Sequence, residues 1–259
     1  MKVAVLGAGA IGGTIAALLS RGGHDVEVTA RGSNLAALRS GTLHLDGAWG
    51  SVHATVTASE SLTRAPELAF VTTKVPDAEV AMLGSAQFLG GIPVVVVQNG
   101  MRSIETAERV LPDSRVVGGL ALYAASYVTG GQVAVTTAGP TYLGAPNPAA
   151  LDAVALASEV LDAVMPVTTT DNFVGAQWTK LVVNQINALP AITGMSSQEV
   201  ISDRRLRMLL TRSIRELVRT AQASGVRFAP MQGLTDGVLR MLGRMPLAVG
   251  QLLPQLMKL

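Results

Sequence analysis

The chain has 259 residues, of which 49% are hydrophobic and 15% are charged, and its formal net charge is +2. A chain of this length and hydrophobicity forms one large domain or two ordinary ones around a packed core, which excludes a disordered protein. It contains no cysteine, which excludes disulfides, thiol catalysis and zinc–thiolate sites.

Strand-like and helix-like segments alternate over the first two-thirds of the chain. Short apolar runs predict strands at residues 3–6, 26–30, 68–73, 94–98 and 116–118. Helices are predicted between several of them, at residues 11–19, 35–39, 77–86 and 104–110. Buried strands joined by helices are typical of a parallel sheet covered on both faces.

The rest of this region is less regular. Residues 42–57 look like a hairpin whose turn contains Asp46-Gly47. After Gly119 the pattern changes to short strands with glycine turns. A helix over residues 151–164 and a last strand at 167–169 complete the predicted α/β part.

The first predicted strand is followed by Gly7-Ala8-Gly9-Ala10-Ile11-Gly12, a G-x-G-x-x-G pattern that opens a helix. In this setting Gly7 permits a tight turn, Gly9 lets the backbone approach a pyrophosphate, and Gly12 allows close helix–strand packing. The helix N-terminus adds free N–H groups and the positive end of the helix dipole. The pattern predicts a dinucleotide site.

The end of the second strand indicates which dinucleotide is bound. Sites that prefer NAD place Asp or Glu there to hold the ribose 2′-hydroxyl. Here the sequence is Thr29-Ala30-Arg31-Gly32-Ser33-Asn34, which has no acid. Arg31 is placed to pair with a 2′-phosphate, helped by Ser33 and Asn34. The predicted cofactor is therefore NADP, as NADPH; the alternative is that Arg31 is an ordinary surface arginine.

Two more polar residues come directly after strands. Lys74 follows the run at 68–73, and Asn99 follows the run at 94–98. Ligands of open parallel sheets bind beyond the carboxyl ends of the strands, so both residues are predicted to face the cofactor crevice. Turn chemistry alone is the alternative for Asn99-Gly100.

From Asp171 onward the pattern is helical. Asp171 is a candidate N-cap for a helix that begins at Phe173 and ends at about Pro190. A long helix is predicted over residues 198–224, ending at Gly225, with weaker helices at 231–242 and 247–257.

The first of these helices carries one polar stripe among apolar neighbours. At roughly 100° per residue, Gln177, Lys180, Asn184 and Asn187 fall on one side. A lysine on such a stripe is costly to bury without a partner, so a group that answers its charge is expected opposite it. The alternative is that Lys180 extends to solvent and the asparagines bond to neighbouring backbone.

The arginines of the 198–224 helix surround an apolar stripe. They are Arg204, Arg205, Arg207, Arg212, Arg215 and Arg219. We interpret them as a solvated helix face rather than a nucleic-acid or membrane surface. No apolar run reaches the length of a membrane span, so a soluble, cytoplasmic protein without a nucleic-acid or membrane partner is expected.

The chain resembles the ketopantoate reductases (2-dehydropantoate 2-reductases) over nearly its whole length. The matching pieces are Gly7–Gly12, Lys74 after the Thr-Thr strand end, Gln98-Asn99-Gly100 and, most specifically, Trp178-Thr179-Lys180-Leu181-Val182-Val183-Asn184. The resemblance implies an N-terminal, Rossmann-type doubly wound domain joined to an all-helical domain, with the active site between them. We place these at residues 1–169, the NADP-binding domain, and 170–259, a helical domain for substrate binding and dimerisation.

The resemblance also implies roles for single residues. The lysine matching Lys180 is the family's general acid, and the asparagines matching Asn99 and Asn184 orient the substrate. Asn99 also lies near the nicotinamide, while Lys74, Arg31 and Ala124 match cofactor contacts. The implied reaction is the NADPH-dependent reduction of ketopantoate to pantoate, a step toward pantothenate and coenzyme A.

Two departures from the family pattern stand out. Asn187, the candidate second substrate-binding asparagine of the helix, comes one residue early, which a local bulge ahead of Pro190 would absorb. Family members continue into a segment with a Ser-Met pair and a Thr-Glu acid, whereas this chain ends at Leu259 after the apolar stretch 246–254. We therefore expect a helical domain shortened at its C-terminus.

Other functions stay open at this point. One is the reduction of a different 2-oxo acid or an imine on the same scaffold; another is a non-catalytic NADPH-binding protein. The small-molecule partner is expected to be a 2-oxo acid, and the apolar helices after residue 190 favour a homodimer.

Overall fold

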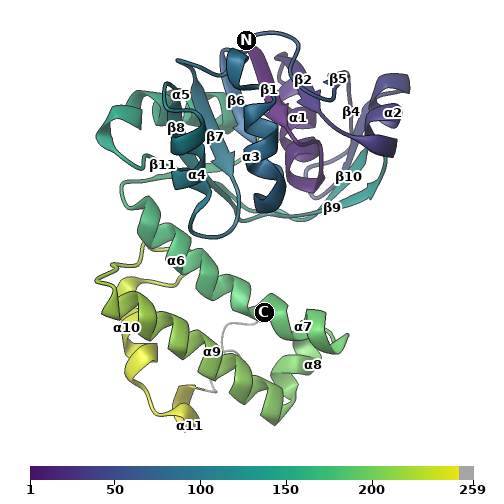
Figure 1. Ribbon diagram of the computed structural model, residues 1–259. Helices are drawn as coiled ribbons and strands as arrows, with labels where there is room; N and C mark the ends of the chain where they lie inside the picture. Colours follow the sequence, from purple (N-terminus) through teal and green to yellow (C-terminus); the bar gives the residue numbers. More distant parts are fainter. Residues whose placement is uncertain (251–259) are drawn as a thin grey trace. The chain divides into compact units, whose positions relative to one another are not determined.

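The computed structural model of the protein describes residues 1–250 (Figure 1). The chain divides into two compact units, unit 1 over Met1–Phe173 and unit 2 over Val174–Leu259. Unit 1 holds all the strands of the described part, and unit 2 is helical there.

Unit 1 is built on an eight-stranded sheet in the order β12-β11-β8-β7-β6-β1-β2-β5. Its strands are β1 (Lys2–Leu6), β2 (Asp25–Thr29), β5 (Thr57–Ser59), β6 (Leu68–Val71), β7 (Pro93–Val97), β8 (Arg115–Ala121), β11 (Thr141–Gly144) and β12 (Val167–Thr170). All neighbours are parallel except β8 and β11. The predicted parallel sheet is confirmed, and β5 is a strand that the sequence pattern did not predict.

The order of the strands fixes where a ligand can bind. From β1 the chain moves outward through β2 to β5, and then returns to β6 on the other side of β1. In a doubly wound sheet this reversal opens a crevice beyond the carboxyl ends of the strands. The loops that begin at Gly7 and at Thr72 leave the sheet at this point.

Helices cover both faces of the sheet (Figure 1). α1 (Ala10–Arg21) and α5 (Leu151–Asp162) share one apolar core with the sheet, whereas α3 (Val75–Leu83) and α4 (Ser103–Val110) pack together elsewhere on it. α2 (Gly32–Ser40) packs against β5, and short 3₁₀ turns lie at Ala86–Phe88 and Pro148–Ala150. The central strands β1, β6 and β7 are buried runs of mostly Val, Leu and Ala, which is why they read as continuous apolar segments.

A second, four-stranded sheet packs against α1. Its order is β4-β3-β10-β9, with β3 at Leu43–Gly47, β4 at Val52–Ala54, β9 at Ala124–Thr129 and β10 at Gln132–Thr137. β3 and β4 are antiparallel, which confirms the predicted hairpin, but Asp46 and Gly47 end β3 and the turn follows them at residues 48–51. A Cβ at Gly13 would lie 2.9 Å from Val133 Cγ1, so the glycine lets α1 approach this sheet closely.

Unit 2 begins with α6 (Phe173–Asn184), whose first residue closes unit 1. It continues through a 3₁₀ turn at Gln185–Asn187, α7 (Ala188–Thr193), α8 (Ser197–Ser202), α9 (Arg204–Ala223), α10 (Asp236–Arg244) and α11 (Leu247–Gly250). Val182 of α6, Val218 of α9 and Leu239 of α10 meet in its apolar core. The apolar face of α9, noted in the sequence, adds Leu210, Ile214 and Ala221 to that core.

Several predicted helix boundaries in unit 2 are wrong. The predicted helix over 198–224 is two helices, because Asp203 ends α8 and caps α9 by accepting from the N–H groups of Arg205 and Leu206. α10 begins at Asp236 rather than at residue 231, because the Thr235 hydroxyl caps it.

The start and end of α6 also differ from prediction. α6 begins two residues after Asp171, where the Asn172 N–H donates to Thr170 Oγ1, so Asp171 does not hold the position before the helix. The helix ends at Asn184 instead of running to Pro190. The predicted helix at 247–257 is observed as far as Gly250, and its remainder lies outside the described residues.

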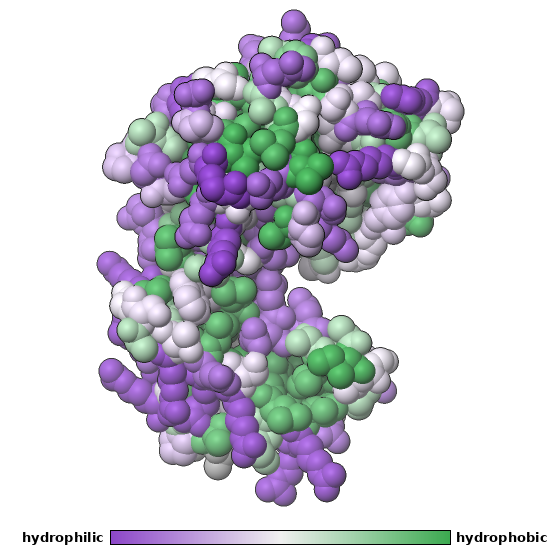
Figure 2. Space-filling model, in the orientation of Figure 1, coloured by the Kyte–Doolittle hydropathy of each residue, from purple (hydrophilic) through white to green (hydrophobic). Residues whose placement is uncertain are grey.

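Some apolar side chains remain on the surface. Figure 2 shows green, hydrophobic side chains gathered over the part of unit 2 that carries α7, and Ile192 of α7 is 78% exposed. Exposed apolar groups of this kind mark interaction surfaces when they gather into large patches. The homodimer predicted from the sequence stays a prediction.

Candidate functional site

The loop after β1 has the conformation that a phosphate-binding turn requires. Gly7 has φ +100°, and a Cβ on it would lie 2.9 Å from Thr73 N. Its N–H donates to Thr29 Oγ1 at 3.0 Å, and the Ala8 N–H donates to Thr29 O at 2.9 Å. Only glycine adopts this φ without strain, so the tight turn predicted at Gly7 is confirmed.

The other two glycines of the loop, Gly9 and Gly12, have different surroundings. A Cβ on Gly12 would lie 2.0 Å from Gly7 O and 2.3 Å from Thr72 Oγ1, so this glycine lets α1 pack against the strand ends. A Cβ on Gly9 would meet nothing within 4 Å. The space beside Gly9 is therefore open to a ligand, as expected where a pyrophosphate approaches the backbone.

The first turn of α1 offers hydrogen-bond donors to such a ligand. The first intrahelical bond runs from the Gly13 N–H to Gly9 O at 2.7 Å. The amides of Ala10, Ile11 and Gly12 precede it and have no acceptor within the helix. Together with the positive end of the helix dipole, they form a site for an anion.

Asn34 holds this loop in place. Its Nδ2 donates to Ala8 O at 2.8 Å, and its Oδ1 accepts from the Gly131 N–H at 3.0 Å. The side chain therefore joins the phosphate loop to the turn between β9 and β10. This is a different use from the one the sequence suggested, which was to assist Arg31 at a 2′-phosphate.

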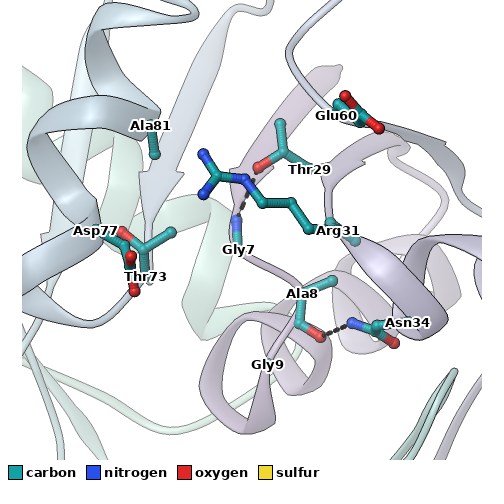
Figure 3. A pocket seen from close by; sticks show the side chains of 11 residues that line it. Gly7, Ala8, Gly9, Thr29, Arg31, Asn34, Glu60, Thr73, Asp77 and Ala81 are labelled. Carbon is teal, nitrogen blue, oxygen red and sulfur yellow. Dashed lines mark hydrogen bonds between the residues drawn. The ribbon is translucent and has the colours of Figure 1, made fainter.

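A hollow of about 390 Å³ lies beside the loop. Its walls include Gly7, Ala8, Gly9, Thr29, Ala30, Arg31, Asn34, Glu60, Thr73, Asp77 and Ala81. In Figure 3 the Arg31 side chain extends across it, with Glu60 on one side and Asp77 on the other. Arg31 forms no ion pair with any carboxylate of residues 1–250. A cation without an internal partner suits a phosphate.

The sequence did not identify Glu60 or Asp77 as lining residues. Asp77 lies in the first turn of α3, where an acid is common for the helix dipole alone. Glu60 follows β5, whose three residues, Thr57–Ser59, lack an apolar run. No local signal marked that strand, so none could place Glu60.

Lys74 and Asn99 lie at the ends of adjacent strands. β6 and β7 are parallel, with Val71 opposite Val96. Gln98 joins the two ends, since its Nε2 donates to Thr73 O at 2.6 Å. Lys74 and Asn99 are both exposed. They are thus placed at the carboxyl edge of the sheet, as the sequence indicated, although neither lines the 390 Å³ hollow.

Ala124, which only the family resemblance suggested, begins β9 and is exposed. Its carbonyl accepts from Thr136 Oγ1 at 3.2 Å. Ala124 is also absent from the walls of the hollow. Its role as a cofactor contact stays a prediction.

In unit 2, Thr179, the residue before Lys180, fixes the orientation of α6 about its own axis. Thr179 is fully buried, and its hydroxyl lies 2.9 Å from Gly175 O and 2.8 Å from Ala229 O. Lys180 itself is half-buried, and this burial lowers the pKa of its ammonium from the ordinary value. A lysine in this state gives up its proton more readily than one on the surface.

The polar stripe continues past the end of α6. Asn184 is the last residue of the α-helix, and Asn187 ends the 3₁₀ turn and is exposed. Side chains three residues apart are eclipsed in a 3₁₀-helix. The turn therefore keeps Asn187 in line with Asn184 along the chain, where the sequence had suggested a bulge.

Two other kinds of site are absent from the described residues. Within 1–250 there is no cluster of three or more His, Asp or Glu side chains able to hold a metal ion. None of the helices in that range is both long enough and apolar enough to cross a membrane.

Comparison with known proteins gives a consistent result for both units. The chain matches the family model for ketopantoate reductase PanE/ApbA over residues 3–148, and that for the C-terminal part of the same family over residues 172–253. A 2-dehydropantoate 2-reductase of Archaeoglobus fulgidus is 31% identical over 204 residues, which cover 77% of this chain and 67% of that protein.

Solved structures share the fold. A PanE/ApbA family ketopantoate reductase of Ralstonia eutropha JMP134 superposes with a TM-score of 0.79 at 24% identity, covering 100% of this chain and 97% of that one. The ternary structure of D-mandelate dehydrogenase with NADH and anilino(oxo)acetate gives a TM-score of 0.81 at 17% identity, with the same coverage.

Proposed function

The chain belongs to the ketopantoate reductase PanE/ApbA family, and from this membership we propose that it reduces 2-dehydropantoate to pantoate with NADPH. The family consists of NAD(P)-dependent oxidoreductases that act on small 2-oxo acids. The match of both family models, one to each unit, is the observation that carries the proposal. In the cell this reaction would be a step toward pantothenate and coenzyme A.

The loop and hollow of unit 1 fit a dinucleotide. The open space at Gly9 and the donors of the first turn of α1 suit the pyrophosphate. Arg31, which has no internal ion pair in residues 1–250, would hold a 2′-phosphate, and this supports NADPH. Lys74, Asn99 and Ala124 are proposed as further contacts toward the nicotinamide end.

Lys180 is the proposed general acid. When bound, the nicotinamide supplies a hydride to the 2-oxo carbon. As the carbonyl π bond opens, negative charge grows on its oxygen, and the Lys180 ammonium stabilises that charge and transfers its proton there. The product is the 2-hydroxy acid, and the neutral amine regains a proton from water. The lowered pKa of Lys180 supports this role, because it brings the acid closer to the operating pH.

The asparagines are proposed to orient the substrate. Asn99 and Asn184, with Asn187 beside the latter, offer amide groups that donate to a carboxylate or accept from a hydroxyl. Being neutral, they do not draw Lys180 into an ion pair that would tie up its proton. The substrate-binding set is thus Asn99, Asn184 and Asn187.

The test is NADPH oxidation with ketopantoate, comparing the wild-type protein with Lys180→Met. Methionine keeps an unbranched side chain but has no proton to give. We expect kcat to fall at least a hundredfold, since a general acid contributes roughly 10²–10⁴-fold. NADPH affinity should stay within about twofold, because Lys180 acts on the substrate oxygen.

Arg204→Met is the matched control, since it removes an exposed cation from the same unit. It should leave turnover unchanged. Turnover with ketopantoate that survives Lys180→Met would remove lysine from the mechanism. Faster turnover of another 2-oxo acid in a panel would assign the protein a different substrate, and tight NADPH binding without turnover of any acid would make it a binding protein.

A further inference from the structure

The sheet supplies an acid beside the carboxyl end of β2, where β2 itself has none. β5 runs parallel to β2, with Ser59 opposite Thr29. The Ala30 N–H donates to Ser59 O at 2.9 Å. Glu60, the next residue after Ser59, therefore leaves the sheet beside Ala30 and Arg31, at its carboxyl edge. This is the region in which dinucleotide sites hold the adenosine ribose.

Glu60 and Arg31 carry opposite charges and line the same hollow. Both side chains line it and both are exposed. They do not form an ion pair with each other, nor does either pair with another charged group of residues 1–250. Figure 3 shows the Glu60 side chain to one side of the extended Arg31 side chain. Each charge thus remains available to a ligand.

The second acid of the hollow, Asp77, has a structural explanation that Glu60 lacks. Asp77 lies in the first turn of α3, and its N–H donates to Lys74 O. An acid at this position stabilises the helix through the dipole. Glu60 lies outside any helix and outside β5, and it forms no ion pair with residues 1–250. A role toward a ligand accounts for an acid placed there.

The Arg31 guanidinium and the Glu60 carboxylate favour different cofactors, NADPH and NADH. A guanidinium binds the 2′-phosphate of NADPH. A carboxylate accepts hydrogen bonds from the ribose hydroxyls of NADH and repels a 2′-phosphate. We propose that Glu60 is a cofactor-specificity residue that binds the adenosine ribose of NADH and limits the preference for NADPH set by Arg31. The site then accepts both dinucleotides; this inference refines the proposed reductase function at its cofactor end.

The test measures cofactor affinity without any substrate. Dissociation constants of NADPH and NADH are determined by titrating nucleotide fluorescence with wild-type protein and with Glu60→Gln. We expect the variant to bind NADH about 3–10-fold more weakly, as for one exposed hydrogen bond to a charged group. It should bind NADPH about 2–5-fold more tightly at low salt, because a like charge near the phosphate is gone.

Two further variants make the result specific. Glu159→Gln removes the same charge from an exposed position on α5, which packs against β7, β8, β11 and β12 rather than β2. It should change neither dissociation constant. Arg31→Ala should weaken NADPH at least tenfold and leave NADH within about threefold, since only the former carries the phosphate.

The outcomes separate this inference from the reductase proposal. A shift of the two affinities in opposite directions supports Glu60 as a specificity residue, even if ketopantoate is not turned over. Equal shifts, no shift, or wild-type binding of only one of the two cofactors overturns it, even if ketopantoate reduction with NADPH is rapid. Melting curves of Glu60→Gln should match the wild type, because the side chain is exposed.

Discussion

Gly9 and Gly12 are three residues apart in one loop, yet the same substitution to alanine should affect them differently. A Cβ on Gly9 points into open space, whereas a Cβ on Gly12 would lie 2.0 Å from Gly7 O. Gly9→Ala should therefore leave the fold intact and weaken cofactor binding. Gly12→Ala should destabilise the fold itself.

The magnitudes follow from the contacts. Gly9 has extended φ and ψ angles that alanine tolerates. Because Gly9 is the N-cap of α1, replacing it with alanine should lower the free energy of unfolding by at most about 1 kcal/mol. At Gly12 the backbone must move by more than an ångström, and overpacking of this kind costs about 1–3 kcal/mol or more. A gain of up to about 1 kcal/mol in helix propensity offsets part of it. At about 2–4 °C per kcal/mol, Gly12→Ala should lower the Tm by several degrees.

Thermal melting and NADPH titration are to be run on both variants. For Gly9→Ala we expect a Tm within about 3 °C of wild type and NADPH binding weakened about 10–100-fold, the equivalent of one hydrogen bond to a charged group. Wild-type affinity in Gly9→Ala would show that no pyrophosphate lies against Gly9. Wild-type stability in Gly12→Ala would show that the close approach of α1 to the loop is wrong.

Three further predictions concern single side chains. Burial lowers the pKa of Lys180 below its ordinary value near 10.5, so the folded state binds the proton more weakly than the unfolded state. The charged lysine therefore lowers the free energy of unfolding at pH values below its lowered pKa, and this cost disappears as the pH rises toward 10.5. Lys180→Met should be more stable than wild type at pH 7, and thermal melts at pH 10–11 should show a smaller difference. Asn34→Ala removes the partners of Ala8 O and of the Gly131 N–H, and urea unfolding should show a loss of about 1–3 kcal/mol, whereas Asn34→Asp keeps the acceptor and should lose less. Thr179→Val fills the same space without the hydroxyl and leaves a buried carbonyl unsatisfied, which should cost about 1–3 kcal/mol and lower kcat more than it changes KM; equal stability of the valine and wild-type proteins would contradict the bond.

The main sheet and the phosphate loop could be predicted because their signals are local. Strands buried on both faces are continuous apolar runs, and the glycine pattern stands directly between a strand and a helix. Lys74 and Asn99 could be placed as well, because the carboxyl ends of parallel strands share one edge. None of these steps needed knowledge of residues distant in the sequence.

Glu60 could not be found in this way, because its position depends on a pairing between distant segments. β5 is three residues long and has only Ser59 buried, so nothing in its sequence marks it as a strand. It becomes one by pairing with β2, more than twenty residues earlier in the chain. The sequence therefore indicated no acid at the ribose, and the preference for NADPH rested on Arg31 alone.

Helix ends in unit 2 were missed for a related reason. An amphipathic pattern continues through Asp203, yet its side chain accepts two backbone N–H groups and starts a new helix there. Those hydrogen bonds also lower the pKa of Asp203, that to Leu206 most strongly. Aspartate favours a cap over a helix interior because its short side chain bonds to nearby backbone. Periodicity predicts the face of a helix, but capping decides where it begins.

In the Trp-Thr-Lys segment, one buried residue fixes the direction of its neighbour. Thr179 has no exposed surface, and its hydroxyl joins α6 to Ala229, in the irregular segment before α10. Successive helix positions differ by about 100°, so fixing Thr179 inward fixes the direction in which Lys180 leaves the helix. The burial that lowers the pKa of Lys180 follows from that direction. The general acid that we propose is thus placed by its neighbour, and it forms no ion pair with residues 1–250.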